Sequence, residues 1–427
     1  MNRNTIYDLA GVGIGPFNLG LAALSHPIAD LSCIFLEQKS VFSWHEGMMI
    51  PGTTLQVPYL ADLVTLADPS SKFSYLNFLR DQNRLLQFGI YDSGYISRTE
   101  YNRYCKWVSS KLDSLLFNHH VKDILYNEKD DLFEILVKKN GKEPTQVICA
   151  RHVVVGIGSS PHIPQNIRGS VDSNIIHSSA YTYHKERMTN SKKITIIGSG
   201  QSAAEILYDL ISSVDLSITQ LNWITRSDRF YAMEHSKLNY EMTSPDYIDF
   251  FYGLDPNIKI QLLRQQFSLY KGINHQLIDA IYNKLYELFI EGEKYNVMIR
   301  THSELKSIEK YYPKEYSLQF YHSALKENYA VNADFVVLAT GYESGLPSIL
   351  TPLKNLIQFD NNGTFLVNRN YSIDQGNRVF VQNMELHSHG FNAPDLGLGA
   401  NRNAVILNNI LKKQIYPVDQ NTCFQKF

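Results

Sequence analysis

The chain has 427 residues, enough for two or three domains with hydrophobic cores of their own. Charged residues make up 19% of the chain and the formal net charge is −2, so no global field favours nucleic acid or an anionic membrane as a partner. No stretch reaches the ~18 apolar residues of a membrane-spanning helix, and the opening residues lead into a strand rather than a signal peptide. The four scattered cysteines form no CxxC pair, which favours a cytoplasmic protein without disulfides or a cysteine-based zinc site.

Residues 5–20 predict a buried strand, a glycine-rich turn and the start of a helix. Such a turn lets backbone N–H groups approach a pyrophosphate at the positive end of the helix. Glu37 ends the next strand about twenty residues later, where its carboxylate can accept hydrogen bonds from both ribose hydroxyls. These features predict a dinucleotide site in which Gly13 faces the pyrophosphate; a tight glycine turn in another α/β fold is the alternative. The residues expected to bind the cofactor here are Gly11, Gly13, Gly15, Pro16 and Glu37.

Residues 42–68 predict a long loop that combines prolines with apolar and aromatic side chains. A loop of this kind inside a compact domain is usually functional, although it can also simply fold back on the core. One helix is predicted over 73–88, and a capping box that begins at Ser97 predicts a second one. Short strands are expected around 121–126, 132–138 and 147–155.

Residues 193–206 repeat the plan of a strand, a glycine turn and a helix. The strand that follows ends at Arg226 and Ser227, where the first cradle has Glu37. Basic and hydroxyl groups at this position suit a 2′-phosphate, so NADPH is predicted rather than NADH, unless Arg226 is only a solvated charge. Two cradles in one chain indicate a flavoprotein that takes hydride from NADPH. The residues assigned to the second cradle are Gly198, Gly200, Gln201, Ser202, Arg226 and Ser227.

Residues 230–300 interrupt the alternation of strands and helices, and two helices are predicted near 257–270 and 275–291. A later strand ends in a glycine turn at Thr340 and Gly341, where the backbone would pass the flavin. The predicted fold is α/β, with two Rossmann-like domains for FAD and NADPH and a small helical insertion. The predicted limits are 1–185 for the first part of the FAD-binding domain, 186–330 for the NADPH-binding domain with its insertion at about 230–300, and 331–427 for the return to the FAD domain and a substrate-site loop.

The chain resembles the flavin-dependent N-hydroxylating monooxygenases of siderophore biosynthesis over nearly its whole length. Members of that family hydroxylate the side-chain amine of lysine or ornithine, or a simple diamine. The resemblance implies bound FAD, NADPH as reductant, O₂ as oxidant, a hydroxylamine product and commonly a homotetramer. The matching segments are GVGIGPFNLGLAAL at 11–24, FSWHEGMMIPGTTLQ at 42–56, DLVTLADP at 62–69, SRTEYNRYCKW at 97–107, IIGSGQSAAE at 196–205, DFVVLATGY at 334–342 and SHG at 388–390.

The same resemblance implies roles for individual residues. Gln56 and the pair Trp44 and His45 are expected at the isoalloxazine ring, and the apolar loop around them would exclude water. Asn274 matches an asparagine that contacts the reacting amine and the nicotinamide region. The reacting amine must be neutral, and burial lowers the pKa of an ammonium group, so no dedicated side-chain base is required.

Two positions depart from the pattern of the amino-acid hydroxylases, which have a lysine that pairs with the substrate α-carboxylate and a serine near the same end of the substrate. This chain has Ala61 and Gly397 there. A carboxylate in such a pocket would lose its water without gaining a partner, at a cost on the order of several kcal/mol. The expected substrate is therefore a primary amine without a carboxylate, putrescine or cadaverine first and histamine second, unless a neighbouring residue replaces the missing contacts. Asp395 and Tyr240 are the expected acceptors for the distal ammonium of a diamine.

Several alternatives compete with this interpretation. N-hydroxylation of lysine or ornithine is the nearest. A Baeyer–Villiger monooxygenase would carry an FxGxxxHxxxW-type stretch before the second cradle, and residues 177–181 lack its Phe-x-Gly and its Trp. A disulfide reductase would need a CxxC pair, and a non-catalytic nucleotide-binding protein would be colourless and would not consume NADPH. No metal is expected, because the HSH spacing of His387 and His389 is poor for a site with His235 and Asp395.

Overall fold

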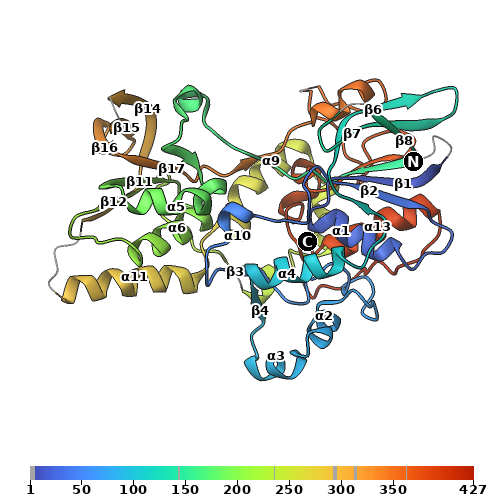
Figure 1. Cartoon of the computed structure of the whole chain (residues 1–427), viewed down its shortest axis with the longest axis horizontal. Helices are drawn as coiled ribbons and strands as arrows, with labels where there is room; N and C mark the ends of the chain where they lie inside the picture. Colours follow the sequence, from blue (N-terminus) through green and yellow to red (C-terminus); the bar gives the residue numbers. More distant parts are fainter. Residues whose placement is uncertain (1–4, 143–144, 235, 292–295, 312–314, 362) are drawn as a thin grey trace.

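The computed structural model describes residues 5–142, 145–234, 236–291, 296–311, 315–361 and 363–427. These residues form two lobes, each built around a sheet, at opposite ends of the long axis in Figure 1. The α/β class and the two Rossmann-like sheets predicted from the sequence are confirmed. None of the helices in the described ranges has the length and apolar character needed to cross a membrane.

The first sheet has the strand order β5-β2-β1-β8-β7-β6, and β19 also pairs with β8. β1 lies parallel between β2 and β8, which explains its nearly continuous apolar sequence. The three short strands predicted after the second helix are present as β6, β7 and β8. The strands of this sheet are Ile6–Val12 (β1), Cys33–Leu36 (β2), Leu115–Leu116 (β5), His119–Asn127 (β6), Leu132–Lys139 (β7), Gln146–Val155 (β8) and Val379–Val381 (β19).

Helices α1 (Pro16–Ser25) and α13 (Gly399–Leu411) pack against each other beside this sheet. Helix α4 (Arg98–Ser109) begins as the capping box predicts, because the Ser97 hydroxyl accepts a hydrogen bond from the N–H of Glu100. The prediction of a single helix over 73–88 was wrong, since the chain forms α2 (Tyr75–Asp81) and α3 (Leu85–Tyr91). Asn83 lies between them in the left-handed conformation at φ 54°, which ends the first helix.

The second sheet is parallel throughout, in the order β10-β17-β11-β12-β13. An antiparallel sheet, β14-β15-β16, lies next to it. Strands β10 and β17 lie outside the range 186–330, so the division of the chain into domains stays a proposal. The strands are Ile175–His177 (β10), Lys193–Ile197 (β11), Gln220–Ile224 (β12), Val297–Arg300 (β13), Ser303–Tyr311 (β14), Glu315–His322 (β15), Glu327–Ala333 (β16) and Phe335–Leu338 (β17).

A helical segment between β12 and β13 contacts both lobes. Helix α11 packs against α6 (Gln201–Ile211) of the second lobe. Helix α8 packs on the first lobe, where the ring centroids of Tyr247 and Phe391 are 5.6 Å apart. The helices of this segment are Lys237–Tyr240 (α7), Pro245–Gly253 (α8), Pro256–Gln265 (α9), Phe267–Lys271 (α10) and His275–Ile290 (α11).

Candidate active site

The first glycine turn lies between β1 and α1, and its glycines serve different purposes. Gly13 has φ +85°, and a Cβ there would lie 2.7 Å from the carbonyl oxygen of Gly156. A Cβ on Gly11 would lie 2.1 Å from the Phe35 ring. These two glycines are therefore required by packing within the protein, which corrects the expectation that Gly13 faces the pyrophosphate.

Gly15 is the residue of this turn that faces open space. It is the N-cap of α1 at φ −84°, and no side chain of the described residues caps the helix. The nearest atom to a Cβ at Gly15 is the carbonyl oxygen of Gly156, at 4.0 Å. The first N–H groups of α1, which begins at Pro16, thus remain available for an anionic group. This cradle fits the pyrophosphate of a dinucleotide.

Glu37 lies beside the same turn, as predicted. Its two carboxylate oxygens accept hydrogen bonds from the N–H groups of Ile14 and Lys39, each at 2.9 Å. The turn therefore fixes the carboxylate at the end of β2, the position from which an acidic residue reaches a ribose in a Rossmann fold.

The loop after β2 places an aromatic pair between the lobes. Trp44 and His45 meet edge to face with ring centroids 4.5 Å apart, and Trp44 also contacts Tyr101. The His45 side chain is partly exposed, yet desolvation, followed by the positive charges of Arg98 and Lys39, lowers its pKa to about 4. The imidazole is therefore neutral at pH 7.

Gln56 carries a buried amide without a partner. It lies in β3 (Thr54–Pro58), which pairs with β4 (Tyr95–Ser97). Its Nε2 atom is buried, and no other atom of the described residues accepts a hydrogen bond from it. An unpaired buried donor costs about 1–3 kcal/mol, so this amide fits a site where a bound group supplies the acceptor.

The second cradle repeats the geometry of the first. Gly198 has φ +139°, and a Cβ there would lie 2.2 Å from the carbonyl oxygen of Ala339, so this glycine is also required by packing. Gly200 is the N-cap of α6 without a side-chain cap, and a Cβ there would be 3.7 Å from its nearest neighbour, the Lys271 carbonyl oxygen. The first turn of α6, with Gln201 and Ser202, therefore presents free N–H groups.

Arg226 and Ser227 follow β12 as predicted. Arg226 is exposed, and the Ser227 hydroxyl lies 3.0 Å from the Ser199 hydroxyl in the second glycine turn. Basic and hydroxyl groups thus stand together at the edge of the second cradle, which suits a 2′-phosphate.

Thr340 and Gly341 lie where the chain leaves the second sheet. The Thr340 hydroxyl donates to the carbonyl oxygen of His162, and Gly341 has φ +85°. The Gly341 carbonyl accepts from the N–H of His162 and lies 2.9 Å from Nε2 of His177. The hydroxyl of Thr340 is therefore engaged by the protein, and a contact to a flavin at this turn would come from the backbone.

A buried ion pair joins the two lobes next to these groups. The Arg98 guanidinium binds both carboxylate oxygens of Glu205 on α6, at 2.8 and 3.0 Å, and the Met48 carbonyl at 2.8 Å. The side chain of Gln201 donates to the same carboxylate and accepts from the N–H of Asn274. Asn274 caps α11 through its side-chain oxygen, which accepts from the N–H of Leu277 at 2.8 Å. The structure thus places Asn274 at the second cradle.

The four residues expected at the far end of the substrate come together from distant parts of the sequence. A Cβ at Gly397 would lie 3.6 Å from the Cβ of Ala61 and 2.7 Å from Oδ1 of Asp395. That oxygen accepts a hydrogen bond from the N–H of Gly397 at 2.6 Å. The Tyr240 hydroxyl lies 3.1 Å from that of Tyr95, which the sequence analysis missed because β4 carries no motif.

Two of these side chains have shifted pKa values. Burial raises the pKa of Asp395, while hydrogen bonds from the N–H groups of Gly397 and Leu398 and the positive charge of Arg402 oppose the rise. Burial, then the hydrogen bond to Tyr95 and the charges of Tyr95 and Asp395, raise the pKa of Tyr240, so its phenol stays neutral. One carboxylate and two phenols form a set of acceptors for an ammonium group.

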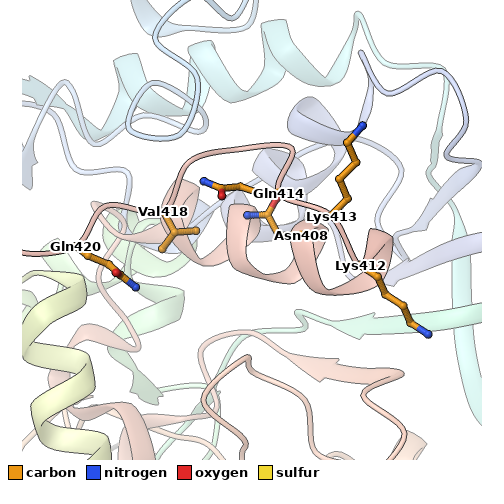
Figure 2. A pocket seen from close by; sticks show the side chains of 6 residues that line it. All are labelled: Asn408, Lys412, Lys413, Gln414, Val418 and Gln420. Carbon is orange, nitrogen blue, oxygen red and sulfur yellow. The ribbon is translucent and has the colours of Figure 1, made fainter.

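Two open cavities lie elsewhere on the molecule. Figure 2 shows the side chains that line a cavity of about 480 Å³ at the end of α13. Most of them are polar, among them Lys412, Lys413 and Gln414. A second cavity of about 470 Å³ lies between α8 and residues 368–370. No residue predicted to bind a cofactor or substrate lines either one.

The histidines of the alternative metal site have other partners. Nε2 of His387 lies 2.9 Å from the Phe365 carbonyl oxygen, and His389 stacks on Tyr371 with centroids 4.5 Å apart. His235 lies outside the described residues. Within the described ranges, no three or more histidine, cysteine, aspartate or glutamate residues are grouped so that they could hold a metal ion.

Comparison with known proteins decides the family. The model of the family described as L-lysine 6-monooxygenase/L-ornithine 5-monooxygenase matches residues 5–344. The chain belongs to this monooxygenase family. This member therefore shares the family's N-hydroxylating, flavin-dependent character, as the resemblance predicted.

Three relatives of this monooxygenase are informative. It is 44% identical to a putrescine N-hydroxylase of Shewanella oneidensis, over 99% of this chain and 84% of the relative. The solved structure of DfoA bound to FAD, the cadaverine monooxygenase of the desferrioxamine pathway of Erwinia amylovora, matches with a TM-score of 0.96 and 42% identity, over 99% of each chain. The ornithine N-hydroxylase KtzI of Kutzneria sp. 744, with reduced FAD, NADP⁺ and L-ornithine, matches with a TM-score of 0.88 and 25% identity, over 96% of this chain and 99% of that chain.

Proposed function

We propose that this protein N-hydroxylates putrescine or cadaverine for hydroxamate siderophore biosynthesis, with FAD, NADPH and O₂. The observation that carries the proposal is the contact between Ala61 and Gly397 beside Asp395. At the two positions where amino-acid hydroxylases have a lysine and a serine, this pocket offers no group for a carboxylate. It offers instead a carboxylate and two phenols that suit an ammonium. The relatives named for putrescine and cadaverine support the same substrate class.

Different residues act on the two ends of the diamine. Asp395 accepts the distal ammonium, with Tyr95 and Tyr240 at its side, and so fixes the length of chain that reaches the reacting end. Bound FAD, reduced by NADPH, supplies the activation of O₂. Gln56 offers its unpaired amide to the flavin, and the aromatic loop at Trp44 excludes water. Asn274, held at the second cradle, would orient the reacting amine between flavin and nicotinamide.

The same pocket discriminates against lysine and ornithine. The α-carboxylate of either amino acid would enter a site that already holds Asp395 and that has no cation in place of Ala61. Removing the hydration shell of this carboxylate without supplying a hydrogen-bond or ion-pair partner costs on the order of several kcal/mol. Discrimination of at least about 100-fold in kcat/KM corresponds to about 2.7 kcal/mol, which is within that cost.

The proposal is tested by coupling NADPH oxidation to hydroxylamine detection over a panel of amines. Putrescine or cadaverine should give close to one hydroxylamine per NADPH, because the bound diamine completes the site and excludes water. Histamine is the second candidate in the panel. Efficient, well-coupled hydroxylation of ornithine or lysine, with weak turnover of the diamines, would refute the proposal.

The preference for NADPH is tested at the edge of the second cradle. Loss of one charge-assisted phosphate contact costs about 1.5–3 kcal/mol, so Arg226→Ala should raise the KM for NADPH by about tenfold or more. The KM for NADH should stay nearly the same. Arg229→Ala is the matched control, because Arg229 stacks on Tyr231 at 4.6 Å and should matter less. Equal losses with NADPH and NADH would mean that Arg226 is structural.

We also propose that the enzyme works in the cytoplasm as a homotetramer. The four cysteines are free thiols, as expected of a reducing compartment. Helix α11 exposes an apolar stripe that suits a contact between copies, formed by Tyr282, Tyr286, Phe289 and Ile290. Analytical ultracentrifugation of the purified protein tests the assembly, and a monomer at micromolar concentration would contradict it.

A further inference from the structure

An ion pair is buried beneath the loop that carries Asp395. Arg402, in the first turn of α13, and Glu385, just before α12 (Leu386–His389), have side chains 2% and 0% exposed. Nη2 of Arg402 and Oε1 of Glu385 are 3.2 Å apart. Burying two charges carries a desolvation penalty that their attraction often fails to offset, so such a pair is weak evidence for stability.

The contacts of Arg402 point to the loop above it. Its Nη2 atom donates to the carbonyl oxygen of Ala393 at 2.7 Å and to that of Asn392 at 3.2 Å. Its guanidinium carbon lies 4.6 Å from the centroid of the Phe17 ring, which supports it from α1. The two carbonyls belong to the residues that lead the chain into Pro394 and Asp395. The guanidinium therefore fixes the backbone immediately before the substrate-facing carboxylate.

The hydrogen-bonding capacity of the pair is incompletely used. Nε and Nη1 of Arg402 and Oε1 of Glu385 are buried without a hydrogen-bond partner among the described residues. Buried N–H groups without acceptors lower stability. The hydrogen bonds that Arg402 does donate go to the loop carbonyls of residues 392 and 393.

The charge of Arg402 also acts on Asp395. Its positive field favours the ionised carboxylate against the effect of burial. The other titratable groups around Asp395 are Tyr240, which stays neutral, and Tyr95, whose hydroxyl bonds to that of Tyr240. Arg402 is thus placed to act on both the direction and the charge of the acceptor.

We propose that Arg402 is a positioning residue for diamine specificity, which holds the carbonyls of residues 392–393 so that Asp395 meets the distal ammonium. Glu385 neutralises the buried guanidinium. The inference rests on the proposed function, because positioning Asp395 matters only for a substrate with a second ammonium group. A monoamine of the same length makes no use of Asp395.

The test is the ratio of kcat/KM for putrescine to kcat/KM for n-butylamine. In Arg402→Lys, an ammonium on a differently shaped side chain replaces the planar guanidinium, whose Nη2 group alone contacts the two carbonyls and the Glu385 carboxylate. The ratio should fall by about tenfold, the effect of a lost charge-assisted hydrogen bond, while kcat/KM for n-butylamine changes little. Asp395→Asn in the same assay measures the full loss of discrimination. Arg378→Lys is the matched control, because Arg378 pairs with Asp131 at the protein surface. The ratio of the two kcat/KM values in this variant should equal that of the wild type.

A second variant keeps the inference testable if Arg402→Lys does not fold. The double variant Arg402→Gln/Glu385→Gln leaves no unpaired buried charge, and its ratio should fall as well. Equal losses for putrescine and n-butylamine would show that Arg402 is only structural, and unchanged kcat/KM values for both amines would refute the inference too. A wild-type enzyme that oxidises NADPH but hydroxylates neither putrescine nor cadaverine would instead refute the proposed function.

Discussion

Ala61→Lys should lower kcat/KM for putrescine by at least about 100-fold. Ala61 is buried at 5% exposure, and it lies against Gly397 and next to Asp395. A lysine ammonium there would compete with the substrate for Asp395 and would repel the distal ammonium. Two like charges about 5 Å apart repel by about 3 kcal/mol at an effective dielectric constant of ~20, which is about 100-fold in rate.

The control for this variant is Ala61→Met, which adds a side chain of similar length without charge. Methionine adapts to irregular space, so it should lower diamine turnover much less than lysine does. Steady-state kinetics with putrescine and cadaverine, at matched flavin content, compare the two variants. An equal loss in both variants would mean that crowding rather than charge lowers diamine turnover, and that the absence of a charge at Ala61 does not set the specificity.

Gly15→Val should abolish flavin binding while leaving the protein folded. The backbone of Gly15 is in a region open to all residues, and a Cβ there meets nothing closer than 4.0 Å. A valine would therefore fit the empty protein but fill the space in front of the first turn of α1, where the pyrophosphate would lie. Flavin absorbance per protein after purification, with far-ultraviolet circular dichroism for the fold, measures the result.

Two other glycines complete that experiment. Gly89→Val, on the exposed side of α3 with nothing within 4 Å of its Cβ, should keep its flavin. Gly13→Val should fail to fold, since its Cβ would collide with the Gly156 carbonyl and its φ is positive. Full flavin content in Gly15→Val would show that the cofactor does not use this end of α1.

The cradles were predictable because their signal is local. A buried strand, a glycine turn and a helix start are contiguous in sequence, and Glu37 follows at a fixed distance. The role of each glycine was not predictable from the same residues. A Cβ at Gly13 would collide with Gly156, and one at Gly198 with Ala339, and each of these neighbours directly follows a strand more than a hundred residues further along the chain. The expectation that Gly13 faces the pyrophosphate was therefore wrong about what its missing side chain makes room for.

The substrate end was predictable only in part. The departures at Ala61 and Gly397 were visible by comparison with relatives, and the fold confirms that the two positions are neighbours. Tyr95 and Arg402 carried no such signal, because Tyr95 lies in a three-residue strand and Arg402 lies in the first turn of α13, outside any motif. Their significance depends on tertiary contacts with Tyr240 and with residues 392–393.

The most direct test of the proposed specificity is a competition. The wild-type enzyme, with NADPH and air, receives equal concentrations of putrescine, cadaverine, ornithine and lysine, and mass spectrometry quantifies the four N-hydroxylated products at early times. Product ratios then report the ratios of kcat/KM directly. We predict that the two diamine products together exceed the two amino-acid products by at least about 100-fold, as about 2.7 kcal/mol of discrimination requires. Products dominated by N-hydroxyornithine or N-hydroxylysine would contradict it.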